Sequence, residues 1–87
     1  MMGPLPLGRV VATPATLNAL TEASEDPLRY LARHASGNLD THDRRENERS
    51  LRHGWRVLSS YPVGEKVIWI ITEADRSVTT LLLPEEY

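Results

Sequence analysis

The side chains best suited to acid–base or metal chemistry in this sequence are three histidines, His34, His42 and His53. A metal site on a helix needs ligands three or four residues apart, and a loop site needs a similarly short spacing. Among the histidines, only His42 has another possible ligand at such a spacing, Glu46, and one pair is too little to hold a metal ion. We therefore expect no metal and no cofactor, and we interpret the histidines as surface or half-buried residues.

A second group of residues has the chemistry of RNA cleavage, which small toxins perform with polar side chains on a compact antiparallel sheet. Such cleavage needs a base with a tuned pKa and a cation that stabilises the phosphorane. The candidates are Arg56, Ser59, Tyr61, Arg76, Thr79 and Thr80. No histidine or glutamate pair is evidently placed beside them. From Val57 onward two cations face five anions, a balance that disfavours binding to a phosphate backbone.

The third candidate region is the highly charged segment 40–53, DTHDRRENERSLRH, which we expect to be a helix. It has one strong apolar residue, so it has little surface to bury. Its four arginines, together with Arg56 just after it, are nearly balanced by Asp40, Asp43, Glu46 and Glu48. Such mixed charge is typical of a solvated or protein-facing helix. We expect either a connector or a surface for a protein partner, without direct contact to nucleic acid.

The last third of the chain must provide the scaffold for these residues, because it holds most of the large apolar side chains. We expect three antiparallel strands at 55–61, 66–73 and 77–83. Pro62 to Glu65 and Ala74 to Arg76 are turn sequences, and in the second turn Asp75 can accept backbone N–H bonds. Connections this short require antiparallel neighbours, so the middle strand should be interior to the sheet.

The first half of the chain is expected to supply a short strand and the helices that cover one face of this sheet. Leu7 to Ala12 is rich in β-branched residues and could join an edge of the sheet as a fourth strand. Thr13–Pro14 and Asp26–Pro27 are helix starts, in which a capping side chain precedes proline at the first helical position. The two helices are expected to end near Ala23 and at Gly37. The residues expected to face the sheet are Leu17, Leu20 and either Ala23 or Ser24 in the first helix, and Leu28, Leu31, Ala32 and Ala35 in the second.

Length and composition limit both the fold and the function. The elements above make a single α+β domain over residues 1–87, a small antiparallel sheet packed by two or three helices. The absence of cysteine excludes a disulfide framework and thiol catalysis. A formal net charge of −2 gives no general attraction to nucleic acid or anionic lipid. No apolar run is long enough to span a membrane, and the N-terminus lacks the features of a signal peptide, so we expect a cytoplasmic protein.

Residues 71–87, ITEADRSVTTLLLPEEY, resemble the C-terminus of a family of short bacterial proteins labelled plasmid-related or hypothetical. The likeness extends over most of the chain. It includes a GRVVATP-like start, the spacing of His34 and Gly37, the stretch with Asp43, Arg44 and Asn47, and the stretch with Arg56, Leu58, Ser59 and Tyr61. Such proteins occur on plasmids, integrative elements and prophages. The resemblance implies a mobile-element setting. That setting raises the hypothesis of a small protein that inhibits a host defence complex, such as a restriction enzyme or a CRISPR effector.

These observations favour a non-enzymatic protein-binding module whose partner is a host protein or protein complex. Two alternatives stay open. One is a small ribonuclease or toxin that uses Arg56, Tyr61, Arg76 and Thr80, and the other is a homodimeric regulator in which an edge strand pairs with its copy. The residues expected to contact the partner are Asp40, Asp43, Arg44, Glu46, Asn47, Glu48, Arg52, Asp75, Arg76, Glu85, Glu86 and Tyr87.

Overall fold

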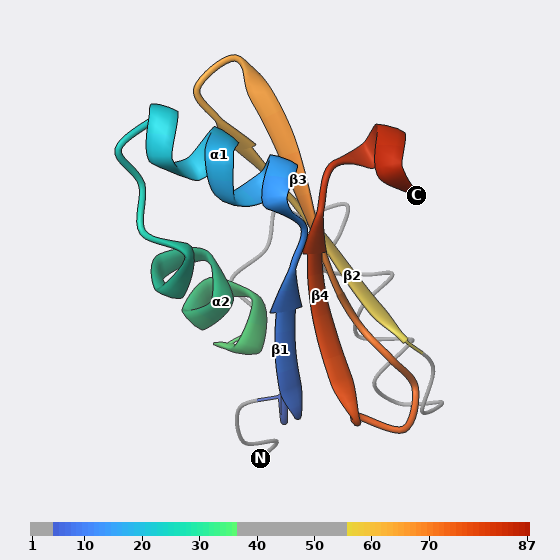
Figure 1. Ribbon diagram of the computed structural model, residues 1–87. Coiled ribbons are helices and arrows are strands. Elements are labelled where there is room, and N and C mark those ends of the chain that lie inside the picture. The colour runs from blue at the N-terminus through green and yellow to red at the C-terminus, as the bar shows by residue number, and fades with distance from the viewer. Residues whose placement is uncertain (1–4, 37–55) are drawn as a thin grey trace.

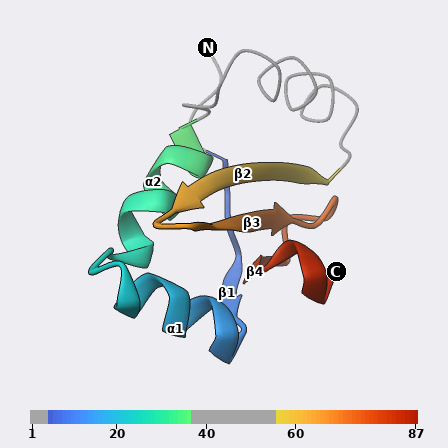
Figure 2. The same ribbon diagram turned by 90° about the horizontal axis from the view of Figure 1, so that it is seen from above.

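A computed structural model describes residues 5–36 and 56–87 of the chain. Two helices, α1 and α2, lie on one side of a four-stranded sheet, and the short 3₁₀ helix η1 lies on the other (Figures 1 and 2). The elements in chain order are β1 (Arg9–Ala12), α1 (Pro14–Glu22), α2 (Pro27–Ser36), β2 (Val57–Val63), β3 (Lys66–Thr72), β4 (Val78–Leu82) and η1 (Pro84–Glu86). The α+β class expected from the sequence is confirmed.

The sheet has the strand order β1-β4-β3-β2, so the C-terminal meander forms as expected and β3 is an interior strand. The N-terminal strand joins the sheet beside β4, but it runs parallel to β4, with Arg9 opposite Val78 and Ala12 opposite Leu81. The expectation of a purely antiparallel sheet was wrong in this respect, and the sheet is mixed. A parallel neighbour needs a long connection, which the helices between β1 and the meander help to provide.

The β2–β3 hairpin is tighter than its sequence indicated, because β2 continues through Pro62 to Val63. Val63 pairs with Lys66, which leaves Gly64 and Glu65 as a two-residue turn. Gly64 has a φ of +61°, a conformation that glycine adopts without a Cβ clash. Pro62 has no N–H to donate, but it lies in an edge strand, where proline is tolerated.

Thr13 begins α1 and also links this helix to the C-terminal residues. Its Oγ1 accepts the N–H of Thr16 at 3.2 Å, and Pro14 follows as the first helical residue, as expected. The same hydroxyl donates to Oε1 of Glu86 in η1 at 2.7 Å. Because its proton is used there, the hydroxyl of Thr16, 2.8 Å away, must donate to Thr13. All three hydrogen-bonding positions of the Thr13 hydroxyl are therefore occupied.

Replacing Thr13 with alanine should lower the free energy of unfolding by about 1–2 kcal/mol, because the helix cap and the link to η1 are lost together. Thr13→Ser keeps the hydroxyl and should lie within roughly 0.5 kcal/mol of the unmodified protein. Urea unfolding measures both changes. Thr21→Ala is the matched control, since Thr21 is exposed on the same helix. A Thr13→Ala protein as stable as that control would contradict the double role of Thr13.

The core lies between the two helices and the sheet. Its most deeply buried apolar residues are Leu20 of α1, Ile68 and Ile70 of β3, and Leu81 of β4. In β2 the buried positions alternate along the strand, and Val57, Ser59 and Tyr61 lie on the face that meets the helices.

The expected inner faces of the two helices are confirmed only in part: Leu20 and Leu31 are buried as expected, but most of the other inner positions differ. The buried residues are Thr16, Ala19 and Leu20 in α1, and Tyr30, Leu31 and His34 in α2. Leu17 and Ala32 are exposed instead, and Leu28 is 68% exposed. The spacing of aliphatic residues does not indicate these inner positions, because a tyrosine or histidine can occupy an inner position when its polar atoms find partners there. The expected polar helix at 40–53, together with Gly37 and Trp55, lies outside the described residues.

Candidate functional site

A buried series of hydrogen bonds joins α2 to all three strands of the meander, and we call it the His34 chain. Nδ1 of His34 lies 2.5 Å from Oγ of Ser59 in β2, and Nε2 lies 2.8 Å from Oγ1 of Thr72 in β3. Thr72 Oγ1 lies 2.7 Å from Oγ1 of Thr79 in β4, which donates to the carbonyl of Leu7 at 2.7 Å. The three hydroxyl residues are 0% exposed and His34 is 1% exposed.

The direction of each hydrogen bond in the His34 chain follows from its last member. Thr79 gives its proton to the carbonyl of Leu7, so its oxygen must accept the proton of Thr72. Thr72 must then accept from His34, which requires a proton on Nε2. Nδ1 of the neutral ring is the acceptor, and Ser59 donates to it. The structure thus assigns the Nε2–H tautomer to His34.

Burial keeps this imidazole neutral. Desolvation lowers the pKa of His34 from 6.5 to about 4. A proton added at Nδ1 would turn the acceptor for Ser59 into a donor, and the hydrogen bonds of the His34 chain could no longer all run in one direction. The expectation of a surface or half-buried histidine was therefore wrong for His34.

Ser59 and His34 have the relative geometry of a nucleophile and its general base, with the hydroxyl donating to the ring. Neither side chain is accessible, so no substrate reaches Ser59 Oγ while α2 covers the sheet. In the folded protein these bonds instead satisfy polar groups in the core and hold α2 in one rotation over the strands.

Sequence spacing gave no sign of the His34 chain, because its hydrogen bonds join residues 25 and 38 positions apart. A signal existed in the strand alternation. Ser59 shares the core face of β2 with Tyr61, and Thr72 lies directly opposite Thr79 on neighbouring strands. Hydroxyl groups at core positions of adjacent strands need a buried polar partner, and α2 offers His34.

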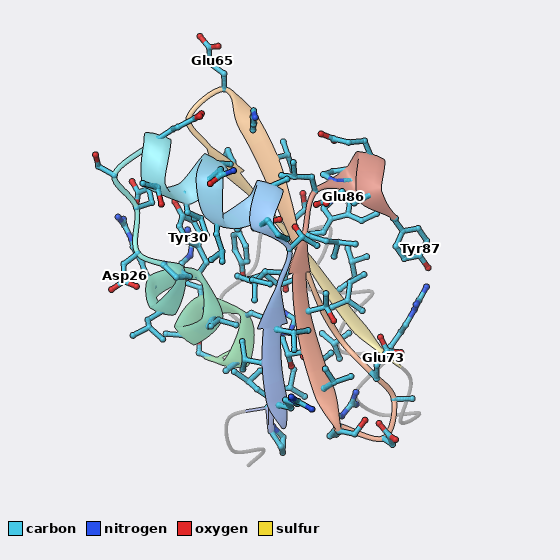
Figure 3. All side chains as sticks on the ribbon, in the orientation of Figure 1. Asp26, Tyr30, Glu65, Glu73, Glu86 and Tyr87 are labelled. Carbon is cyan, nitrogen blue, oxygen red and sulfur yellow. The ribbon has the colours of Figure 1, made fainter. Side chains whose placement is uncertain are left out.

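On the other face of the sheet, Arg56, Trp69 and Tyr87 form a second cluster, which we call the C-terminal patch. The rings of Trp69 and Tyr87 meet edge to face, with their centroids 5.7 Å apart. The guanidinium of Arg56 lies 5.3 Å from the centre of the Tyr87 ring and also donates to its hydroxyl. Tyr87 is nevertheless 65% exposed, and Figure 3 shows it at the surface beside η1.

Glu86 fixes η1 and thereby the position of Tyr87. Its Oε1 accepts the backbone N–H of Leu83 at 2.9 Å and the hydroxyl of Thr13 at 2.7 Å. These two bonds, with that from Leu83 the stronger influence, lower the pKa of the Glu86 carboxyl. Glu86 is therefore a structural anchor for the C-terminal patch.

The described members of the expected partner surface lie at the two ends of β4 and do not form one surface. Asp75 and Arg76 belong to the β3–β4 turn, whereas Glu85, Glu86 and Tyr87 lie in or beside η1 (Figure 1). The other expected contact residues, Asp40, Asp43, Arg44, Glu46, Asn47, Glu48 and Arg52, lie outside the described residues.

The β3–β4 turn is organised by its own side chains. Asp75 Oδ1 accepts the N–H of Ser77 at 3.0 Å and its hydroxyl at 2.6 Å, as expected for an aspartate in a turn. These bonds lower the pKa of Asp75, with the hydroxyl bond the larger cause. Arg76 has a φ of +61° and donates to the carbonyl of Glu73 at 3.1 Å. Both residues thus have structural roles in the turn.

The residues of the ribonuclease alternative are not brought together. Tyr61 is buried on the helix side, with its ring 5.6 Å from that of Tyr30. Thr80 points to the other face of the sheet, because side chains alternate along a strand and its neighbours meet the core. Arg56 belongs to the C-terminal patch, and Arg76 lies in the β3–β4 turn. A shared phosphate site for these four side chains is not formed.

Within residues 5–36 and 56–87, no group of three or more histidine, aspartate or glutamate side chains could hold a metal ion. In that same part of the chain, no helix is long and apolar enough to cross a membrane. Comparisons with known proteins gave no match to any family, to any curated protein or to any solved structure. The resemblance to plasmid-related proteins therefore stays a prediction.

Proposed function

We propose that this protein is a cytoplasmic, non-enzymatic protein-binding module and that the C-terminal patch is part of its contact surface. The observation that carries the proposal is Tyr87, which is 65% exposed and yet held between Trp69 and Arg56. Binding energy at protein interfaces is concentrated in tryptophan, tyrosine and arginine, the three residue types of this patch. An aromatic ring that is already ordered loses little conformational entropy on binding.

The charges beside the patch favour a basic protein as the partner. Glu85 is exposed in η1, two residues before Tyr87, and the charge of Glu73 acts on Arg56. With a net charge of −2, the whole chain also suits a basic protein surface better than it suits a phosphate backbone. In its most specific form, the proposal makes the partner a host defence complex with a nucleic-acid-binding surface, as the resemblance to mobile-element proteins implies.

Two observations support binding over catalysis. Among the described residues, one pair has nucleophile–base geometry, namely Ser59 and His34. Both side chains are buried where α2 packs on the sheet. The residues of the ribonuclease alternative lie in separate places on the sheet. The charged segment 40–53 stays a further predicted part of the contact surface.

Tyr87→Ala is expected to weaken binding to the partner by roughly 30-fold or more, the loss typical of a central aromatic contact. The partner is isolated by co-purification with the tagged protein from a lysate of its native host, with and without nuclease treatment. The affinity of the purified partner is then measured by calorimetry. Leu28→Ala is the matched control, because Leu28 on α2 is 68% exposed and lies away from the patch.

One stoichiometric protein that survives nuclease treatment, and that binds Tyr87→Ala more weakly than Leu28→Ala, would support the proposal. Recovery of ribosomes or RNA that disappears after nuclease treatment would favour the ribonuclease alternative instead. A partner that binds both variants equally well would place the contact surface elsewhere.

A further inference from the structure

The outer edge of β1 carries backbone groups that the sheet does not use. The N–H groups of Arg9 and Thr13 donate to carbonyls beside and within β4 at 2.9 and 3.0 Å. In a parallel pair every second residue faces the neighbouring strand, so Arg9, Val11 and Thr13 face β4. The N–H and C=O groups of Val10 and Ala12 therefore point outward, and no described residue is hydrogen-bonded to them.

This edge is accessible from both sides of the sheet. Val10 is 44% exposed and Val11, on the other face, is 39% exposed. Edge strands are usually protected from pairing by a proline, an inward-pointing charge or a bulge. β2, at the opposite edge, contains Pro62, whereas β1 contains no proline and has its one charge, Arg9, at its first position.

One antiparallel register matches the β1 edge to the same edge of a second copy. With Val11 on the two-fold axis, Val10 faces Ala12 of the second copy, and the two residues exchange both of their hydrogen bonds. The larger Val10 side chain then meets the smaller Ala12. The Val11 side chain lies opposite Val11 of the second copy, on the face of the sheet that carries η1.

The same register is complementary in charge. It sets Arg9 opposite Thr13 of the second copy, on the face of the sheet where η1 lies. The Thr13 hydroxyl holds the carboxylate of Glu86 at 2.7 Å, so each Arg9 meets an anion of the other copy. Within the described residues of one chain, Arg9 has no ion-pair partner.

From these observations we infer that β1 pairs with β1 of a second copy and forms a two-fold symmetric dimer with one continuous sheet. The backbone bonds of Val10 and Ala12 hold the two strands, and the Arg9–Glu86 pairs fix the register. This inference goes beyond the proposed function and does not depend on it, because it needs neither Tyr87 nor a foreign partner.

Sedimentation equilibrium of the full chain, over a wide range of protein concentration, tests this dimer. Val11→Lys places like charges together at the two-fold axis and should raise the dimer dissociation constant roughly tenfold or more. Val67→Lys is the matched control, because Val67 is 41% exposed on the same face of the sheet but belongs to β3. A chain that stays monomeric up to millimolar concentration overturns the inference, as does an equal effect of both substitutions.

Mixing Val11→Lys with Val11→Glu tests whether Val11 faces its own copy. Opposite charges at the axis should restore association, with a dissociation constant close to that of the unmodified protein. Both variants should melt like the unmodified protein at low concentration, because Val11 is an exposed position. Variants that fold normally but do not associate when mixed would overturn the proposed register.

Discussion

Lowering the pH from about 7 to about 4 is expected to reduce the free energy of unfolding by about 3 kcal/mol through His34 alone. The folded ring has a pKa of about 4, against 6.5 for an ordinary histidine in the unfolded chain. The unfolded state therefore takes up a proton first as the pH falls. This contribution is complete above pH 6.5, decreases below that value and is lost at about pH 4. For a domain of this size it is a large share of the total stability.

Urea unfolding between about pH 4.5 and 7 measures how the free energy of unfolding changes with pH, in a range where most carboxylates are not yet protonated. His34→Gln is the comparison, because it should be less stable at neutral pH but should lose this part of the pH dependence. NMR of the ring nitrogens reports the tautomer and the pKa directly. A ring that carries its proton on Nδ1, or that titrates near 6.5, would contradict the His34 chain as described.

Gly8→Ala is expected to lower the free energy of unfolding by about 3 kcal/mol or more. Gly8 has a φ of +64°, and a Cβ at this position would lie 2.4 Å from the carbonyl oxygen of Ser77 and 2.5 Å from that of Arg76. Both are backbone atoms and cannot rotate away. β1 would have to move from β4, which would break the bond from the Arg9 N–H to Ser77.

Gly64→Ala provides a matched control for Gly8→Ala. Its φ of +61° is nearly the same, but the nearest atom to its added Cβ is the Cβ of Ala23 at 3.7 Å. Only the left-handed conformation is penalised there, at about 1–2 kcal/mol. Thermal and urea unfolding of the two variants separate the cost of the left-handed backbone conformation, which both share, from the cost of the close contact of Cβ with the carbonyl oxygens, which only Gly8→Ala has. Equal losses of stability would mean that the close contact at Gly8 has no effect.

The parts of this fold that were predictable from the sequence have local signals. Thr13–Pro14 and Asp26–Pro27 predicted where the helices begin, and the structure confirms both, with Asp26 Oδ1 accepting the N–H of Leu28 at 3.0 Å. The three strands of the meander followed from short apolar runs between turns. The C-terminal residues were predicted as a partner surface, and that function stays a prediction.

What could not be predicted depends on contacts between distant residues. The parallel direction of β1 is decided by the path of the intervening chain and not by the four residues of the strand. The expected inner face of α2 left out His34 because histidine is polar, and its hydrogen-bond partners Ser59 and Thr72 lie on two strands that are distant in the sequence. The C-terminal patch likewise joins Arg56 to Tyr87, whose contact exists only after the sheet has formed.

The pairing of β1 with β4 also affects how the chain emerges from the ribosome. Arg9 is made well before its strand partner, Val78. Until β4 is available, β1 has no strand beside it, and α1 and α2 have no complete sheet to cover. Contacts between such distant segments are slow to form, and the apolar faces stay exposed meanwhile. Folding of this sheet during translation is therefore postponed until β4 is available, and a nascent chain stalled before β4 becomes a substrate for chaperones and proteases.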